Sequence, residues 1–253
     1  MKRSITLLLL CLTTGFASAQ RPAADQVQTS AGTLTIQPVF HAAMVLTWDN
    51  KTIYIDPYGG AKAFEGLAAP DLVLITDIHQ DHLDPGTLNA IQTGKATFIV
   101  PQAVADKMPE NLKSKCVIIA NGKSINEKGI DIEAIPMYNL PEDEKAMHTK
   151  GRGNGYVLTL GGKKVYISGD TEDIAEMRRL KNIDVAFVCM NLPYTMDVKQ
   201  ASSAVLEFKP VIVYPYHYRG QDGLSDTEEF KKLVEAGSKG IDVRLRNWYA
   251  EYK

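Results

Sequence analysis

The segment TDIHQDHLDP, residues 76–85, concentrates two histidines and three aspartates directly after the apolar run LVLI, residues 72–75. The whole chain contains only five histidines. A short, uninterrupted apolar run is typical of a strand that is buried on both faces. The polar segment is therefore expected at the C-terminal end of a buried strand, which is where open α/β sheets place their binding sites.

Four side chains of this segment are suited to metal binding. Asp77, His79, Asp81 and His82 offer two carboxylates and two imidazoles within six residues. Both groups are good ligands for zinc, manganese or iron. The alternative is that polar residues before a helix serve only as caps and turns. Asp84, which precedes a proline, is itself expected to be the N-cap of a helix.

Strands and helices are predicted along the rest of the chain, without a Gly/Pro/Ser-rich linker to divide it. The pairs Asp49-Asn50 and Gly161-Gly162 predict tight turns between neighbouring strands. The pattern indicates one layered α/β domain over residues 33–253. The predicted strands are LTIQPVF, MVLTW, TIYIDP, LVLIT, ATFIV, CVIIA, IDIEAI, GYVLTL, KVYISGD, DVAFVCM, VIVYPY and DVRLRNW. The predicted helices follow Asp84 and lie at 103–114, 171–180, 197–208 and 226–236.

The N-terminal residues have the pattern of a targeting segment. Residues 1–19 combine a basic start, an apolar stretch at 5–16 and an A-x-A cleavage site at 17–19, which is typical of a secretory signal peptide. Residues 20–32 are polar and are expected to form a loose leader. We therefore expect an exported, periplasmic protein with no integral membrane segment after signal cleavage.

The charge distribution argues against a nucleic-acid partner. The formal net charge is -2 and the basic residues are scattered, whereas nucleic-acid-binding domains carry a basic patch or stripe.

Several motifs, in order along the chain, resemble those of one family. DIHQDH at 77–82 resembles the H-x-H-x-D-H motif of the metallo-β-lactamase superfamily, with an aspartate in place of the first histidine. Other motifs resemble the branch that holds ascorbate-6-phosphate lactonase-like and N-acyl-phosphatidylethanolamine phospholipase D-like proteins. These motifs are FHAA (40–43), TIYIDP (52–57), HLDPGTL (82–88), YISGDTED (166–173) and PYHY (215–218).

The resemblance implies a four-layer αββα sandwich with a two-metal site at one edge of its sheets. The implied ligands are Asp77 and His79 for the first metal, Asp81, His82 and His217 for the second, and Asp170 as the bridge. A hydroxide between the metals would be the nucleophile, because a bound metal lowers the pKa of water toward neutrality. Asp81 or Asp170 would position that nucleophile or shuttle a proton.

The implied activity is that of a secreted metal-dependent hydrolase that acts on an ester, lactone or phosphodiester of a small molecule. One or two divalent transition metals are expected as cofactors, with zinc ahead of manganese or iron.

Two departures from the family pattern affect the first metal. Asp77 stands where the motif has a histidine, and its carboxylate adds negative charge and a harder donor. The strand IDIEAI should be followed closely by another histidine, but Met137-Tyr138-Asn139 stands there. His148 precedes GYVLTL by a short gap and is expected to be the missing ligand. The alternative is that Tyr138 takes the ligand position and His148 is a surface residue.

Further residues are expected to support the ligands or face the substrate. His41 lies near the metals in the family pattern without being a ligand, and Asp56 ends a buried strand, where it can bond a ligand loop. An arginine near the mouth would suit an anionic substrate. The residues in this group are His41, Asp56, Tyr138, Asn139, Arg152 and Tyr194.

A non-catalytic function is the alternative to hydrolysis. The altered first ligand at Asp77 favours a periplasmic metal- or ligand-binding module with a degenerate site. The presence of Asp81, His82, Asp170 and His217 together favours catalysis.

Overall fold

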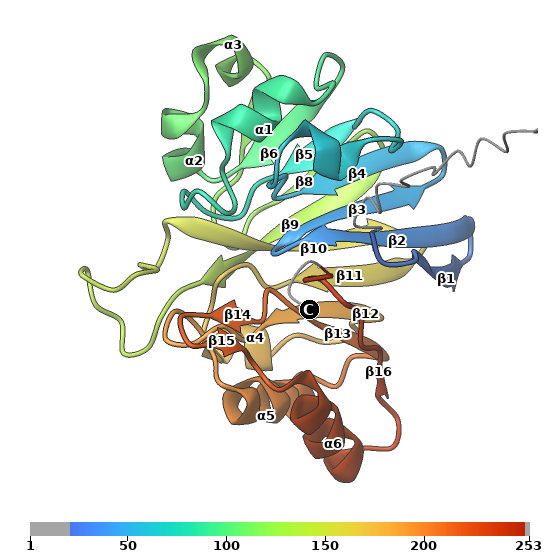
Figure 1. Ribbon diagram of the computed structural model, residues 1–253, viewed down its shortest axis with the longest axis vertical. Coiled ribbons are helices and arrows are strands. Elements are labelled where there is room, and N and C mark those ends of the chain that lie inside the picture. The colour runs from blue at the N-terminus through green and yellow to red at the C-terminus, as the bar shows by residue number, and fades with distance from the viewer. Residues whose placement is uncertain (1–20, 251–253) are drawn as a thin grey trace, which may run out of the picture.

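Two seven-stranded β-sheets pack face to face, with helices on the outer side of each (Figure 1). The structure is a computed structural model that describes residues 21–250. Its layers run from helices through two sheets to helices, which confirms the predicted αββα arrangement. Within the described residues, no helix is both long enough and apolar enough to span a membrane.

The first sheet follows the chain order. Its early strand pairs are antiparallel, whereas the later ones are parallel. Its strands are β1 (Asp25–Thr29), β2 (Gly32–Phe40), β3 (Ala43–Trp48), β4 (Lys51–Ile55), β5 (Leu72–Leu74), β6 (Thr97–Val100) and β7 (Cys116–Ile118). The helices near this sheet are η1 (Ala61–Phe64), α1 (Pro85–Ala90), α2 (Gln102–Lys107) and α3 (Glu110–Lys113).

The second sheet has the order β16-β13-β12-β11-β10-β9-β8. Its strands are β8 (Ser124–Glu127), β9 (Ile130–Met137), β10 (Gly153–Leu160), β11 (Lys163–Ile167), β12 (Val185–Cys189), β13 (Ile212–Tyr216) and β16 (Asp242–Val243). The strands β14 (Arg219–Gly220) and β15 (Gly223–Leu224) form a small separate hairpin. The helices on this side are α4 (Ala175–Arg178), α5 (Val198–Phe208) and α6 (Thr227–Gly237).

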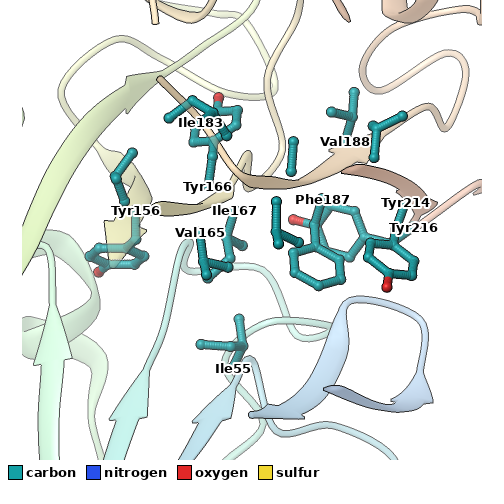
Figure 2. Packing of buried hydrophobic residues seen from close by; sticks show 14 of the residues in the cluster. Ile55, Tyr156, Val165, Tyr166, Ile167, Ile183, Phe187, Val188, Tyr214 and Tyr216 are labelled. Atoms are coloured by element: carbon teal, nitrogen blue, oxygen red, sulfur yellow. The ribbon is translucent and has the colours of Figure 1, made fainter. Parts of the chain in front are cut away.

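Strand β5 shows how an apolar run is buried on both faces. Leu72 and Leu74 belong to the core between the sheets, whereas Val73 packs with residues of α1 and α2. All three are fully buried, as the run LVLI predicted, because successive side chains of a strand point to opposite faces. Figure 2 shows the inter-sheet core, in which Ile55 of β4 lies across from Val165 of β11. Burying one such side chain contributes roughly 1.5–3 kcal/mol.

The two sheets are also joined by polar contacts close to the site. The hydroxyl of Tyr156 on β10 lies 2.9 Å from the carbonyl oxygen of Ile75 and 3.2 Å from that of Ile99. The backbone N–H of Asn154 donates to the carbonyl of Thr76 over 2.9 Å. These contacts fix the end of β5 against β10, and the segment that carries the predicted ligands begins there.

The N-terminal predictions have two outcomes. Part of the predicted leader, residues 25–29, is not loose but forms β1, which pairs with β2. Val27 is buried and Asp25 is held by Arg244 and Arg246. Polar composition hid this strand because an edge strand needs few apolar residues. The predicted signal peptide, residues 1–19, lies outside the described residues.

Three other predicted elements are shorter than expected. The helix at 103–114 divides into α2 and α3 at Pro109, because a residue before proline avoids the helical region, and Met108 has ψ 146°. The helix at 171–180 is reduced to α4. The last strand leaves the sheet after Val243.

Candidate metal centre

All seven predicted metal ligands lie at one edge of the sheets. Four of them, Asp77, His79, Asp81 and His82, lie on the loop from β5 to α1, and Asp84 caps that helix by accepting from the N–H of Gly86. The others come from three separate connections, because the parallel strands of both sheets end at this edge. They are His148 between β9 and β10, Asp170 after β11 and His217 after β13.

Asp170 lies between three imidazoles. Its Oδ1 is 3.2 Å from Nε2 of His217. Its Oδ2 is 3.3 Å from Nε2 of His82 and 3.3 Å from Nε2 of His148. The side chain is almost fully buried. Its two oxygens therefore face different histidines, which is the arrangement that a bridging ligand requires.

A second group surrounds Asp77. Its Oδ2 is 2.9 Å from Nδ1 of His79 and 3.9 Å from Nε2 of His148. The donor atoms of these three residues lie close enough together to hold one metal ion, as do those of His82, Asp170 and His217. Six of the seven predicted ligands thus fall into two neighbouring clusters, one of Asp77, His79 and His148 and the other of His82, Asp170 and His217. Asp170 also contacts His148 of the Asp77 cluster.

Asp81 is the most exposed carboxylate of the site, with 30% of its side chain accessible. Its Oδ2 lies 3.2 Å from Nε2 of His41 and 3.4 Å from Nε2 of His217. Nδ1 of His41 is 2.7 Å from the hydroxyl of Tyr249. His41 therefore links Tyr249 to Asp81. Together, His41, Asp81 and His217 form a third group of possible metal ligands.

The ring nitrogens of the site fit a divalent metal. Among the described residues, Nε2 of His82, Nε2 of His148 and both ring nitrogens of His217 are buried without a hydrogen-bond partner, as is Oδ1 of Asp170. Leaving a buried polar atom unsatisfied costs about 1–3 kcal/mol. Imidazoles and carboxylates that converge in this way are the usual ligands of zinc and related transition metals.

Asp56 supports His82 from behind, as predicted for its position. Its Oδ2 lies 2.9 Å from Nδ1 of His82. The same carboxylate accepts the N–H and the hydroxyl of Thr76. A hydrogen bond at Nδ1 leaves the lone pair on Nε2 and increases its basicity, which is the usual support of a metal-binding histidine.

Strained backbone occurs at three of these positions. His41, Asp56 and His217 have φ of 58°, 43° and 46°. Non-glycine residues rarely adopt positive φ, and such a conformation costs of the order of 1–3 kcal/mol. The fold therefore aims these side chains into the site at the expense of backbone strain.

His148 is held in the site by Asn139. The N–H of His148 donates to Oδ1 of Asn139 over 2.8 Å, and the N–H of Asn139 donates to the carbonyl of His148 over 2.9 Å. Nδ1 of His148 lies 3.2 Å from the same Oδ1. Tyr138 faces elsewhere, since its hydroxyl donates to Glu176. The structure thus brings His148, and not the Tyr138 hydroxyl, to the other ligands.

A cavity of about 460 Å³ opens beside the two clusters. Of the predicted substrate-facing residues, His41 and Tyr194 line it. Arg152 is not among the lining residues and instead pairs with Asp77. The lining residues that the sequence did not indicate are Met147, Asn191, Arg219, Gly220 and Gln221. One signal was available, because residues 219–221 follow the PYHY motif almost directly.

Burial and mutual attraction shift the pKa values of the site. Burial alone would lower the pKa of His217, but the negative charge of Asp170 and the close side-chain contacts with Asp170 and Asp81 raise it to about 9. Burial would raise the pKa of Asp170, yet His217 and His82 hold it well below its ordinary value. Burial lowers the pKa of His41 to about 4, despite the hydrogen bond to Asp81. Without metal, a proton on the imidazole of His217 therefore balances the negative charge of Asp170.

The metal-free protein is expected to lose stability as the pH rises from 6.5 to about 9. The folded-state pKa of His217 is raised from 6.5 to about 9. The stabilisation that the protonated imidazole gives the folded state is therefore fully present below pH 6.5 and is lost as the pH rises through about 9. A metal competes for the same nitrogens, so metal affinity should rise over this window, by up to about tenfold per pH unit for each displaced proton.

Denaturant unfolding of chelated protein on both sides of this window would measure the effect, with zinc titrations at the same pH values. His217→Gln is the control, because its stability should depend less on pH. An equally steep dependence in that variant would show that His217 is not responsible.

The comparisons with known proteins agree with this geometry. Residues 35–217 match the family model described as the β-lactamase superfamily domain. The UPF0173 metal-dependent hydrolase of Pyrococcus abyssi is 33% identical over 217 residues, which cover 81% of this chain and 93% of that protein.

Two solved structures are also similar. A crystal structure assigned as a metal-dependent hydrolase from Parabacteroides distasonis is 38% identical, with a TM-score of 0.79, and the match covers 89% of this chain and 98% of that one. A metallo hydrolase from Ignicoccus hospitalis is 26% identical, with a TM-score of 0.70 and coverage of 84% and 94%. The chain therefore belongs to the metallo-β-lactamase superfamily and, within it, to the UPF0173 metal-dependent hydrolases.

Proposed function

We propose that this metal-dependent hydrolase cleaves an ester, lactone or phosphodiester bond of a small anionic molecule at the edge where Asp77, Asp170 and His217 meet. One observation carries the proposal: buried, unpartnered nitrogens of three histidines converge on Asp170 beside a cavity of about 460 Å³. A cavity of this volume is in the range of small-molecule sites. The motifs that resemble lactonase-like and phospholipase D-like proteins support the choice of bond.

The two clusters would hold the metal through their imidazoles and carboxylates. When bound, a divalent metal polarises an oxygen of the substrate and supplies a water molecule that ionises near neutral pH. Asp56 keeps the Nε2 lone pair of His82 directed into the centre. Asn139 does the same for His148 through the contact at Nδ1.

Asp81 is suited to orient the attacking water. Burial would raise its pKa, but His82, His217 and His41 hold that pKa far below its ordinary value, so the carboxylate is ionised at neutral pH. An ionised carboxylate at the cavity wall accepts a hydrogen bond from water. A neutral His41 donates from Nε2 to Asp81 and accepts at Nδ1 from Tyr249, which fixes the carboxylate in place.

The other residues that line the cavity supply groups that fit a polar, anionic substrate. Arg219 contributes positive charge, and Asn191, Tyr194 and Gln221 contribute polar side chains. Met147 adds an apolar surface. This combination favours a substrate with a carboxylate or phosphate group and a short apolar part.

The experiment is metal removal and reconstitution. Chelated protein would be reloaded separately with zinc, manganese and ferrous iron, and each form assayed against chromogenic esters, lactones and phosphodiesters. We expect no turnover without metal and hydrolysis of one of these bond classes with it. Stoichiometric metal binding without hydrolysis of any of them would favour a binding module, and failure to bind metal would refute the proposed centre.

A further inference from the structure

Asp77, which stands where the family motif has a histidine, has a partner that the sequence did not indicate. Nε of Arg152 donates to Oδ1 of Asp77 over 3.0 Å, and Nη2 donates to Oδ2 over 2.7 Å. Asp77 is fully buried, and Arg152 keeps only 18% of its side chain exposed. This is a buried arginine–carboxylate pair with two parallel charge-assisted hydrogen bonds, the geometry in which such pairs are strong and specific.

The backbone on both sides is built to bring the pair together. The N–H of Asn154 donates to the carbonyl of Thr76 over 2.9 Å. Between Arg152 and Asn154 stands Gly153, where a Cβ would lie 2.8 Å from that carbonyl and 2.7 Å from Cε of Met137. Only glycine permits this approach, so Arg152 is seated against Asp77 by the fold.

The pair has the net charge of the histidine that it replaces. An ionised carboxylate and a guanidinium sum to zero, as does a neutral imidazole. Burial would raise the pKa of Asp77, but hydrogen bonds from His79 and Arg152 lower it to about 2, so the carboxylate is ionised. The guanidinium of Arg152 occupies a lone pair on each carboxylate oxygen of Asp77 and offsets part of the negative charge. Asp77 is therefore a weaker metal ligand than a free carboxylate.

Among the described residues, no arginine or lysine pairs with the carboxylate of the neighbouring cluster, and the protons on its histidines are displaced when a metal binds. Asp170 faces only histidines in its ion-pair contacts. His82 is backed by the carboxylate of Asp56, which strengthens its Nε2 as a donor. The two clusters therefore differ in the charge that they offer to a cation.

We propose that the Asp77–Arg152 pair makes the two metal positions unequal: one metal is held tightly by His82, Asp170 and His217, and a second is held weakly by Asp77, His79 and His148. This inference rests on the metal centre of the proposed function. It adds that the second position fills only when free metal is abundant, so that metal supply sets how much of the protein carries two ions.

The experiment is a zinc titration of metal-free protein by calorimetry, with metal counted after dialysis. The wild type should show two steps that differ in affinity by about tenfold or more, and should keep close to one zinc per chain. Arg152→Met removes the cation while preserving length, so the weak step should tighten by about tenfold or more. Arg152→Lys, which keeps the charge, is the matched control and should not tighten it.

Asp77→Asn should abolish the weak step and preserve the tight one, and the tight step reports in every variant that the centre is folded. Two wild-type steps of equal affinity, a second step absent up to millimolar zinc, or a weak step that Arg152→Met does not tighten would each overturn this inference and leave the proposed function standing. A wild type that binds no metal would overturn both.

Discussion

Replacing Asp170 with asparagine is expected to remove most of the bound metal and to lower kcat/KM by at least about a thousandfold, the scale of several kcal/mol of lost transition-state stabilisation. The reason is its position: its two oxygens face three histidines from both clusters, at 3.2–3.3 Å. Asparagine keeps the shape but lacks the negative charge that a shared ligand must supply. Metal per chain and hydrolysis by the reconstituted enzyme would measure the effect.

A nearby aspartate provides the matched control. Asp173 pairs with Arg178 outside the site, so Asp173→Asn should keep full metal content while making the same chemical change. Circular dichroism would establish that both variants are folded. If Asp170→Asn retained its metal and its activity, the metal would have to be held by a group of possible ligands without Asp170, which is either Asp77, His79 and His148 or His41, Asp81 and His217.

Local sequence signals were sufficient to predict most of the fold. The pair Asp49-Asn50 forms the turn between β3 and β4, with φ of 48° and 56°, because these two residue types tolerate positive φ better than most. The run LVLI gives β5, buried on both faces. Strand β1 was missed because an edge strand can be mostly polar. Its pairing with β2 is local, but the arginines that hold Asp25 lie more than two hundred residues along the chain.

The candidate site also contains residues that local motifs predict and residues that only the tertiary structure brings into place. The convergence of the candidate ligands could be predicted because most of them occupy short motifs at strand ends, where a local pattern specifies both residue type and position. The role of Arg152 could not, because it depends on the seating of β10 against Thr76, a contact between the two sheets. Arg219 was missed for a similar reason, since the hairpin of β14 and β15 brings it to the cavity.

The second large effect is expected at His148. His148→Ala should reduce the zinc bound at saturation from two ions per chain toward one and lower kcat/KM by about a hundredfold or more. The side chain is buried, its Nε2 lies 3.3 Å from Asp170 and 3.9 Å from Asp77, and that nitrogen has no hydrogen-bond partner among the described residues. Without this imidazole, the weaker cluster would retain only Asp77 and His79.

Tyr138→Phe is the control that separates the two readings of the missing family histidine. The hydroxyl of Tyr138 donates to Glu176 and accepts from Nζ of Lys150, and neither partner is a candidate ligand, so its removal should leave the zinc count unchanged. Atomic emission measurements of both variants at saturating zinc would decide the matter. A full zinc count in His148→Ala, or a lowered one in Tyr138→Phe, would mean that His148 does not supply the third imidazole, and that its burial against Asn139 serves only to close the loop between β9 and β10.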